Sequence, residues 1–204
     1  MVPSAFGLLG VSEVWGNRVK KRFTKHAEQW ELNMTKKERE SSPVVHIDEV
    51  EEVVHTSGEH WGGGYKVLTP WMTEGGGKLG LNLSRLPPGR TTCPFHYHDL
   101  EDEAFYVISG RGVLRYGDEL FELRAGHTIS CPAGTKVAHQ IANPYDEDML
   151  YLAIGNREPN EVCVYPDSGK IMVRSLQTVG RLTGTEYMDG EPDNPKIFDI
   201  IKGA

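Results

Sequence analysis

The 204-residue sequence predicts an all-β protein, a barrel or sandwich, preceded by a helical extension. Between residues 44 and 174, short runs rich in β-branched, leucine and aromatic residues recur at regular spacing, as strands of such folds do. Gly, Pro, Asn and Asp residues separate these runs, and each favours tight turns. Apolar residues at helical spacing are almost confined to the first 34 residues. This length suits one domain with a substantial core and additional terminal segments.

Residues 1–42 are expected to be an N-terminal extension, partly helical or disordered. After Asn17, which suits an N-cap, apolar residues at steps of three or four trace one helix face. They are Val19, Phe23, Ala27, Trp30 and Met34. We weigh an arm that docks on the domain or on a partner subunit against an extension that frays in solution. Translation could also begin at Met34, in which case residues 1–33 would not belong to the native protein.

The β domain is expected over residues 43–176. A first strand falls within residues 44–54, and a second, over 65–71, lies between glycine-rich loops at 61–64 and 75–77. Leucines alternate with small or polar residues over 79–83, as in a half-buried strand. Further strands are expected at residues 104–108, 112–116, 120–123, 128–131, 137–141, 149–154, 162–165 and 170–174. Residues 177–204 are polar and are predicted to be a surface tail with one strand at 185–188.

The composition excludes several classes of protein. Twenty-two Lys and Arg against 29 Asp and Glu give a net charge of −7, which disfavours a nucleic-acid partner. The three cysteines, Cys93, Cys131 and Cys163, are widely spaced and form no CxxC pair, so they suit a reducing, cytoplasmic location. No apolar run is long enough to span a membrane, so no membrane association is expected.

Two histidines two positions apart form the most informative feature of the sequence. On a β-strand, side chains two residues apart share a face, so His96 and His98 can chelate one ion. Glu103 lies an odd number of positions further on and would face the other way on an unbroken strand. We therefore predict that residues 99–102 form a hairpin loop, which brings Glu103 onto an adjacent strand and into the site.

Two ordered motifs around these residues resemble those of the cupin superfamily. The first matches at Gly89, His96, His98, Glu103 and Gly110, with one extra residue between Gly89 and His96. The second matches at Gly126, Pro132, Gly134, His139 and Asn143, with four residues instead of two between Gly134 and His139. The resemblance covers residues 44–174 and is closest to small, single-domain bacterial members.

The resemblance implies a double-stranded β-helix, or jelly roll, and a metal site. Its ligands would be His96, His98, Glu103 and His139. Three imidazoles and a carboxylate suit a divalent transition metal such as Fe, Mn, Ni, Zn or Cu better than Ca or Mg. Asp102 is an alternative acidic ligand, but the four-residue spacing favours Glu103. Phe105 shares the parity of Glu103 and would line the pocket or fill the barrel.

The resemblance does not select one activity, because cupin sites support several chemistries and plain ligand binding. We expect a metal-dependent enzyme of oxygenase or isomerase type that acts on a small polar metabolite. The alternative is a non-catalytic protein that binds or senses a small molecule or a metal. We also expect a homodimer, since small cupins associate through barrel edges and exposed strand edges need covering.

Overall fold

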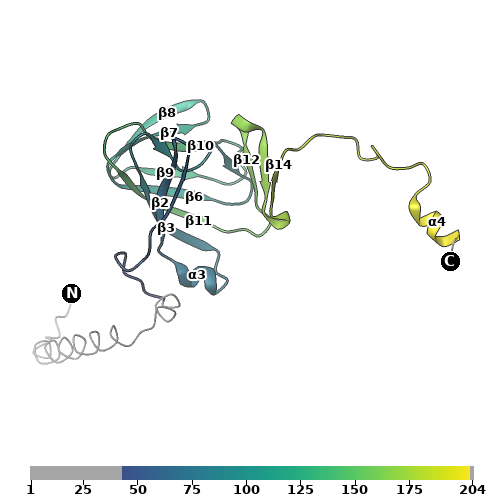
Figure 1. Ribbon diagram of the computed structural model, residues 1–204, viewed down its shortest axis with the longest axis horizontal. Coiled ribbons are helices and arrows are strands. Elements are labelled where there is room, and N and C mark those ends of the chain that lie inside the picture. Colours follow the sequence, from purple (N-terminus) through teal and green to yellow (C-terminus); the bar gives the residue numbers. More distant parts are fainter. Residues whose placement is uncertain (1–42, 203–204) are drawn as a thin grey trace, which may run out of the picture.

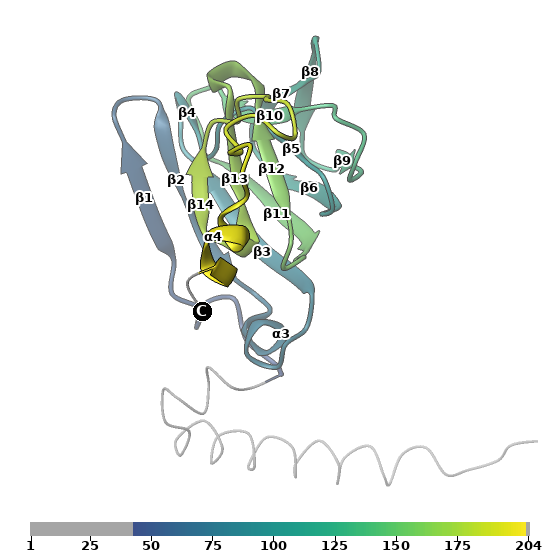
Figure 2. The same ribbon diagram turned by 90° about the vertical axis from the view of Figure 1, so that its right-hand side faces the viewer.

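The computed structural model describes residues 43–202, and β-strands dominate them. The large curled sheet has the strand order β8-β7-β10-β4-β2-β3-β11-β6-β9, with β1 paired to β2 (Figure 1). A smaller sheet has the order β14-β13-β12-β5. Figures 1 and 2 together place this small sheet against one side of the large one. The mostly β, curled architecture confirms the predicted jelly roll.

The elements follow one another along the chain with few helices between them. Their bounds are β1 (Val53–Ser57), β2 (Trp61–Val67), α3 (Pro70–Glu74), β3 (Leu79–Leu86), β4 (Arg90–Thr91), β5 (Tyr97–His98), β6 (Glu103–Ser109), β7 (Arg111–Tyr116), β8 (Glu119–Arg124), β9 (Thr128–Cys131), β10 (His139–Asn143), β11 (Met149–Asn156), β12 (Val162–Tyr165), β13 (Lys170–Val173), β14 (Thr178–Gly180) and α4 (Lys196–Lys202). Short 3₁₀ turns occupy Pro166–Ser168 and Arg174–Leu176. Most of the strands predicted from the sequence are present within a few residues of their expected bounds.

The hydrophobic core lies inside the curl of the large sheet. Leu86, Val107 and Met149 are completely buried there, on the neighbouring strands β3, β6 and at the start of β11. Burying each such side chain contributes about 1.5–3 kcal/mol. The alternation of buried and exposed residues along β6 and β7 follows from the pleat, in which successive side chains point to opposite faces.

The prediction of a glycine-rich loop at residues 61–64 was wrong, because these residues belong to β2. A Cβ at Gly63 would lie 2.8 Å from the carbonyl oxygen of Arg85 on the adjacent strand. A Cβ at Gly64 would lie 2.2 Å from Oε1 of Glu52. Glycine therefore allows close approach within a strand here. The expected strand at 65–71 ends early, since Pro70 begins helix α3.

The prediction that residues 99–102 form a hairpin loop was also wrong. Strand β5 pairs with β12 in the small sheet, whereas β6 pairs with β9 and β11 in the large sheet. The intervening segment is held by side chains instead. Asn156 Oδ1 accepts a hydrogen bond from the Asp102 amide at 2.7 Å, and Glu161 accepts from two other amides of the segment. The segment thus crosses from one sheet to the other.

The C-terminal segment leaves the small sheet after β14 and ends in α4 (Figure 1). Strand β14 pairs with β13 and so extends the small sheet beyond Leu176. The predicted strand at 185–188 is absent: the Asp189 amide donates to the Glu186 carbonyl in a turn, and Gly190 has a φ of +85°. Helix α4 was not predicted from the sequence.

The N-terminal extension, with its predicted helix and the alternative start at Met34, lies outside the described residues. Within residues 43–202, no helix is both long and apolar enough to cross a membrane.

Candidate metal centre

The four predicted ligands meet where the two sheets join. His98 lies on β5 of the small sheet, and His96 precedes that strand and forms an isolated β-bridge with His139. His139 begins β10 and Glu103 begins β6, both in the large sheet. The His96 amide donates to the His139 carbonyl at 3.1 Å, and the reverse bond is 2.7 Å. These paired backbone bonds fix the spacing of two imidazoles from distant parts of the sequence.

The imidazoles converge on one carboxylate oxygen. Glu103 Oε2 lies 2.9 Å from Nε2 of His139, 3.3 Å from Nε2 of His98 and 3.7 Å from Nε2 of His96. All three rings are largely buried, and the His139 side chain is only 3% exposed. The same nitrogen of each ring therefore faces the same point, as ligands of one ion would.

The other ring nitrogens have distinct surroundings. His96 Nδ1 lies 2.8 Å from the Pro94 carbonyl oxygen, a contact that requires a proton on Nδ1, so Nε2 is the nitrogen that a metal would bind. His98 Nδ1 lies 3.2 Å from Oε1 of Glu161. Among the described residues, His98 Nε2 and His139 Nδ1 are buried without a hydrogen-bond partner. Because an unpartnered buried nitrogen is costly, His98 Nε2 fits a bound cation.

Burial and the shared carboxylate set the protonation of the site. Burial acts to lower the pKa of His96, but its interactions with Cys93 and Glu103 outweigh burial and raise that pKa to about 11. Burial also acts to lower the pKa of His98, but the close contact with the Glu103 carboxylate outweighs it and raises that pKa. For His139 burial prevails and the pKa is lowered. Without a metal, protons on the imidazoles thus balance the charge of Glu103.

Glu103 itself stays ionised. Burial acts to raise its pKa, but the hydrogen bond from His139 and the close contacts with His96 and His98 hold that pKa well below its usual range. An ionised carboxylate beside three imidazoles is a donor set that suits divalent transition metals. His96, Glu103 and His139 each offer a ligand atom within 4.8 Å of the others, so the residues present fit such an ion.

The cluster lines a cavity of about 350 Å³. Phe105 lines the cavity and also belongs to the core, so both interpretations of this residue hold. Besides the cluster and the cysteines, the polar side chains around the cavity are those of His55, Tyr65, Asn82, Ser84, Thr92, Tyr151 and Tyr165. Burial raises the pKa of Tyr151 to about 12 and that of Tyr165 still further, so both phenols stay protonated near neutral pH. A protonated phenol can donate a hydrogen bond to a polar ligand.

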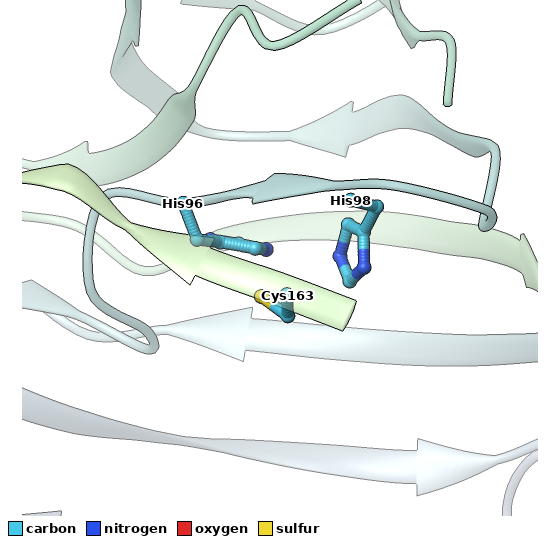
Figure 3. Close-up of side chains that lie close together, drawn as sticks. All are labelled: His96, His98 and Cys163. Atoms are coloured by element: carbon cyan, nitrogen blue, oxygen red, sulfur yellow. The ribbon is translucent and has the colours of Figure 1, made fainter. Parts of the chain in front are cut away.

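The alternative acidic ligand does not enter the cluster. Asp102 Oδ1 instead accepts a hydrogen bond from the Ala133 amide at 2.8 Å. Cys93 lines the cavity, and so does a second cysteine, Cys163, whose sulfur lies within 4.8 Å of one nitrogen each of His96 and His98. Figure 3 shows these two rings with Cys163 on the neighbouring strand β12.

Sequence reasoning missed the acidic residues behind His98. Glu161 and Glu101 are 0% and 5% exposed, and both have oxygens near Nδ1 of His98. The one available signal was local: Glu161 directly precedes a strand that was predicted correctly. Nothing in that pattern shows which strand lies beside it, so its proximity to His98 follows only from the pairing of β12 with β5.

Comparisons with known proteins find similar sequences and similar structures. Residues 82–155 match the family model of the cupin domain. A crystal structure from Silicibacter pomeroyi, described as a sugar phosphate isomerase from a cupin superfamily, is 27% identical with a TM-score of 0.59. That similarity covers 74% of this chain and 97% of the other.

Two curated relatives match shorter stretches. An uncharacterized protein of Methanocaldococcus jannaschii is 35% identical over 68 residues, which are 33% of this chain and 52% of the relative. Auxin-binding protein 1 of Arabidopsis thaliana is 33% identical over 94 residues, 42% of this chain and 46% of the relative. The chain thus spans about half the length of the curated relatives that it matches.

Proposed function

Because the chain belongs to the cupin superfamily, we propose that it is a metal-dependent enzyme that acts on a small polar metabolite. The convergence of three Nε2 atoms on Glu103 Oε2 inside a cavity carries this proposal. The ligands would be His96, His98, Glu103 and His139, and the metal would be divalent Fe, Mn, Ni, Zn or Cu.

Isomerisation of a phosphorylated sugar is the chemistry that we favour over oxygenation. The support for this choice is the similarity to the Silicibacter pomeroyi structure described as a sugar phosphate isomerase. That similarity extends over 97% of the isomerase chain. A cavity of about 350 Å³ suits a ligand of this size. A bound metal would supply Lewis acidity that polarises a substrate carbonyl or hydroxyl.

The chain's own side chains would bind and orient the substrate. Tyr151 and Tyr165, which remain protonated, would donate hydrogen bonds to its oxygens. Asn82 and Ser84 would contribute further polar contacts from strand β3. Phe105 and Ile141 give the cavity apolar walls, which exclude water and strengthen the polar contacts.

Metal analysis of protein purified without added metal, combined with turnover assays on a panel of sugar phosphates, tests the proposal. We expect a stoichiometric transition metal in the wild type and its loss in His96→Ala. His127→Ala is the matched control, because His127 does not line this cavity. A wild-type protein without metal, or a His96→Ala variant with full metal content, would overturn the proposal.

A binding protein without catalytic activity is the second candidate. The 33% identity to auxin-binding protein 1 over 94 residues favours it, since the name of that relative describes binding. The same panel separates the two functions. Turnover of any compound supports the enzyme, whereas a retained ligand that is recovered unchanged supports the binding protein.

We further propose a cytoplasmic homodimer. Strand β8 is an edge of the large sheet, and Leu120 and Phe121 on it are 71% and 44% exposed. An exposed apolar edge strand favours pairing with another chain. Light scattering coupled to size-exclusion chromatography tests this: a monomer at micromolar concentration would exclude the dimer, and a dimer disrupted by Leu120→Lys would support it.

A further inference from the structure

A buried carboxylate lies directly behind the candidate metal centre. Glu161 is 0% exposed and immediately precedes strand β12. Its Oε1 accepts hydrogen bonds from His98 Nδ1 at 3.2 Å and from the Asp99 amide at 3.0 Å. Its Oε2 accepts from the Leu100 amide at 2.9 Å. A carboxylate is buried without water only when such donors compensate its charge.

A second acidic residue beside Glu161 is neutralised separately. Glu101 forms a two-pronged ion pair with Arg174, in which Nη2 lies 2.8 Å from Oε2 and Nη1 contacts Oε1. Its Oε1 also accepts from the Glu158 amide at 2.6 Å. The hydrogen bond with Glu101 is the main cause that raises the pKa of Arg174, and the nearby charge of Glu161 adds a smaller contribution.

His98, Glu101 and Glu161 would by distance alone also form a metal site, since one atom of each lies within 4.8 Å of the others. Their hydrogen bonds argue against a second ion. Arg174 and a backbone amide occupy the oxygens of Glu101, and two further amides occupy those of Glu161. Protein donors therefore satisfy the carboxylate of Glu161. Two of them are backbone amides, and the third is the Nδ1–H group of His98.

We propose that Glu161 is a positioning residue that holds His98 in the tautomer with its proton on Nδ1. That tautomer leaves the lone pair on Nε2, the nitrogen that faces Glu103 and has no hydrogen-bond partner among the described residues. The same carboxylate accepts hydrogen bonds from the amides of Asp99 and Leu100 and so fixes the segment that leads to Glu103. The inference rests on the proposed metal site, and Glu161 acts through His98 without touching the metal or the substrate.

The substitution Glu161→Gln replaces one acceptor oxygen of the carboxylate by an NH₂ donor, with almost no change in side-chain volume. An amide has one acceptor oxygen and one NH₂ group, but the three donors around Glu161 all need acceptors. If the NH₂ group faces His98, the imidazole must accept on Nδ1 and carry its proton on Nε2, where it would block metal binding. If the NH₂ group faces Leu100 instead, it meets the Leu100 amide, which is also a donor, and residues 99–102 must shift.

The test measures zinc affinity and the tautomer of His98 together. Zinc affinity, determined by competition with a chelator, should fall about 10- to 100-fold in Glu161→Gln, the usual loss when such a supporting partner is removed. Glu52→Gln is the matched control: it removes a carboxylate paired with Arg85 and distant from His98. It should leave zinc affinity unchanged. Equal affinity in wild type and Glu161→Gln would overturn the inference.

The tautomer is read from long-range ¹H–¹⁵N NMR spectra of the histidine side chains. In the zinc-loaded wild type, His98 should carry a proton on Nδ1, and this readout needs no variant to fold. Zinc bound with the His98 proton on Nε2 would overturn the inference and leave the proposed function intact. A wild type that binds none of Fe, Mn, Ni, Zn and Cu, yet has neutral His98 protonated on Nδ1, would overturn the proposed function and still support Glu161 as the group that sets the tautomer.

Discussion

The two sheets of the molecule bury different kinds of side chain. The large sheet encloses Leu86, Val107 and Met149, which belong to one cluster of buried hydrophobic side chains. The small sheet and the segment that leads from it bury Glu161, and Glu101 is almost equally enclosed. Apolar burial is insensitive to pH and to ions, whereas each buried charge depends on a specific partner. Stability should therefore be concentrated in the large sheet, and sensitivity to protons and metals at its junction with the small one.

The response of zinc binding to pH should be the largest effect at this junction. His96, with a pKa of about 11, must release a proton to zinc across the whole range from pH 5 to 8. One released proton gives a tenfold change in affinity per pH unit, hence about a thousandfold tighter binding at pH 8 than at pH 5. Isothermal titration calorimetry at several pH values would measure this, and equal affinities at both ends would contradict it.

The stability of the metal-free protein should fall, as pH rises above neutrality, over the range in which zinc affinity increases. The raised pKa of His96 contributes stability that is fully present below its usual value of 6.5 and is lost as pH rises towards 11. The lowered pKa of Glu103 contributes stability that is present above 4.5 and lost at lower pH. The combined contribution of His96 and Glu103 to stability is therefore greatest between about pH 4.5 and 6.5. Thermal melts of metal-free protein at several pH values would measure it.

A core truncation in the large sheet should cost stability and spare the site. Leu86→Ala should reduce the free energy of unfolding by about 2–5 kcal/mol, because the side chain is completely buried and leaves a cavity. Zinc affinity of the folded variant should stay at the wild-type value. Urea titration provides the measurement, with Ile108→Ala as the control, since Ile108 is 42% exposed on the same sheet. A large change in the zinc affinity of Leu86→Ala would contradict the inference that the core of the large sheet supplies stability without affecting the site.

Breaking the ion pair of the small sheet should have a smaller effect on stability. Arg174→Met leaves the Glu101 carboxylate without its partner, at a cost of about 1–3 kcal/mol once the partial exposure of Arg174 is allowed for. Adding Glu101→Gln should restore part of the loss, since the uncompensated charge is then removed. A double-mutant cycle by urea unfolding measures the coupling. Two independent, additive losses would show that the pair does not act as a unit.

The smallest effect is expected for an ion pair on the large sheet. Glu52 and Arg85 are about a third exposed, and Arg85 holds the pKa of Glu52 below its usual value. Glu52→Gln should therefore cost less than about 1 kcal/mol. The Glu52 contribution is present above pH 4.5 and is lost as the solution is acidified. A loss equal to that of Arg174→Met, measured in the same buffer, would erase the distinction between the two pairs.

Local patterns in the sequence determined much of this protein. Turn residues and apolar alternation predicted the β architecture and most strands within a few residues of their bounds. The spacing of His96 and His98 placed both imidazoles on one side of the chain, and motif order added Glu103 and His139. These inferences succeed because backbone geometry fixes which side chains share a face within a few residues.

Only the tertiary structure decided how these local pieces meet. The placement of β5 and β6 in different sheets, the glycines inside β2 and the carboxylate of Glu161 behind His98 all depend on partners far away in the sequence. A glutamate beside a strand has the same local pattern whether water or a histidine surrounds it. Its burial is set by long-range strand pairing, which periodicity along a single strand does not encode.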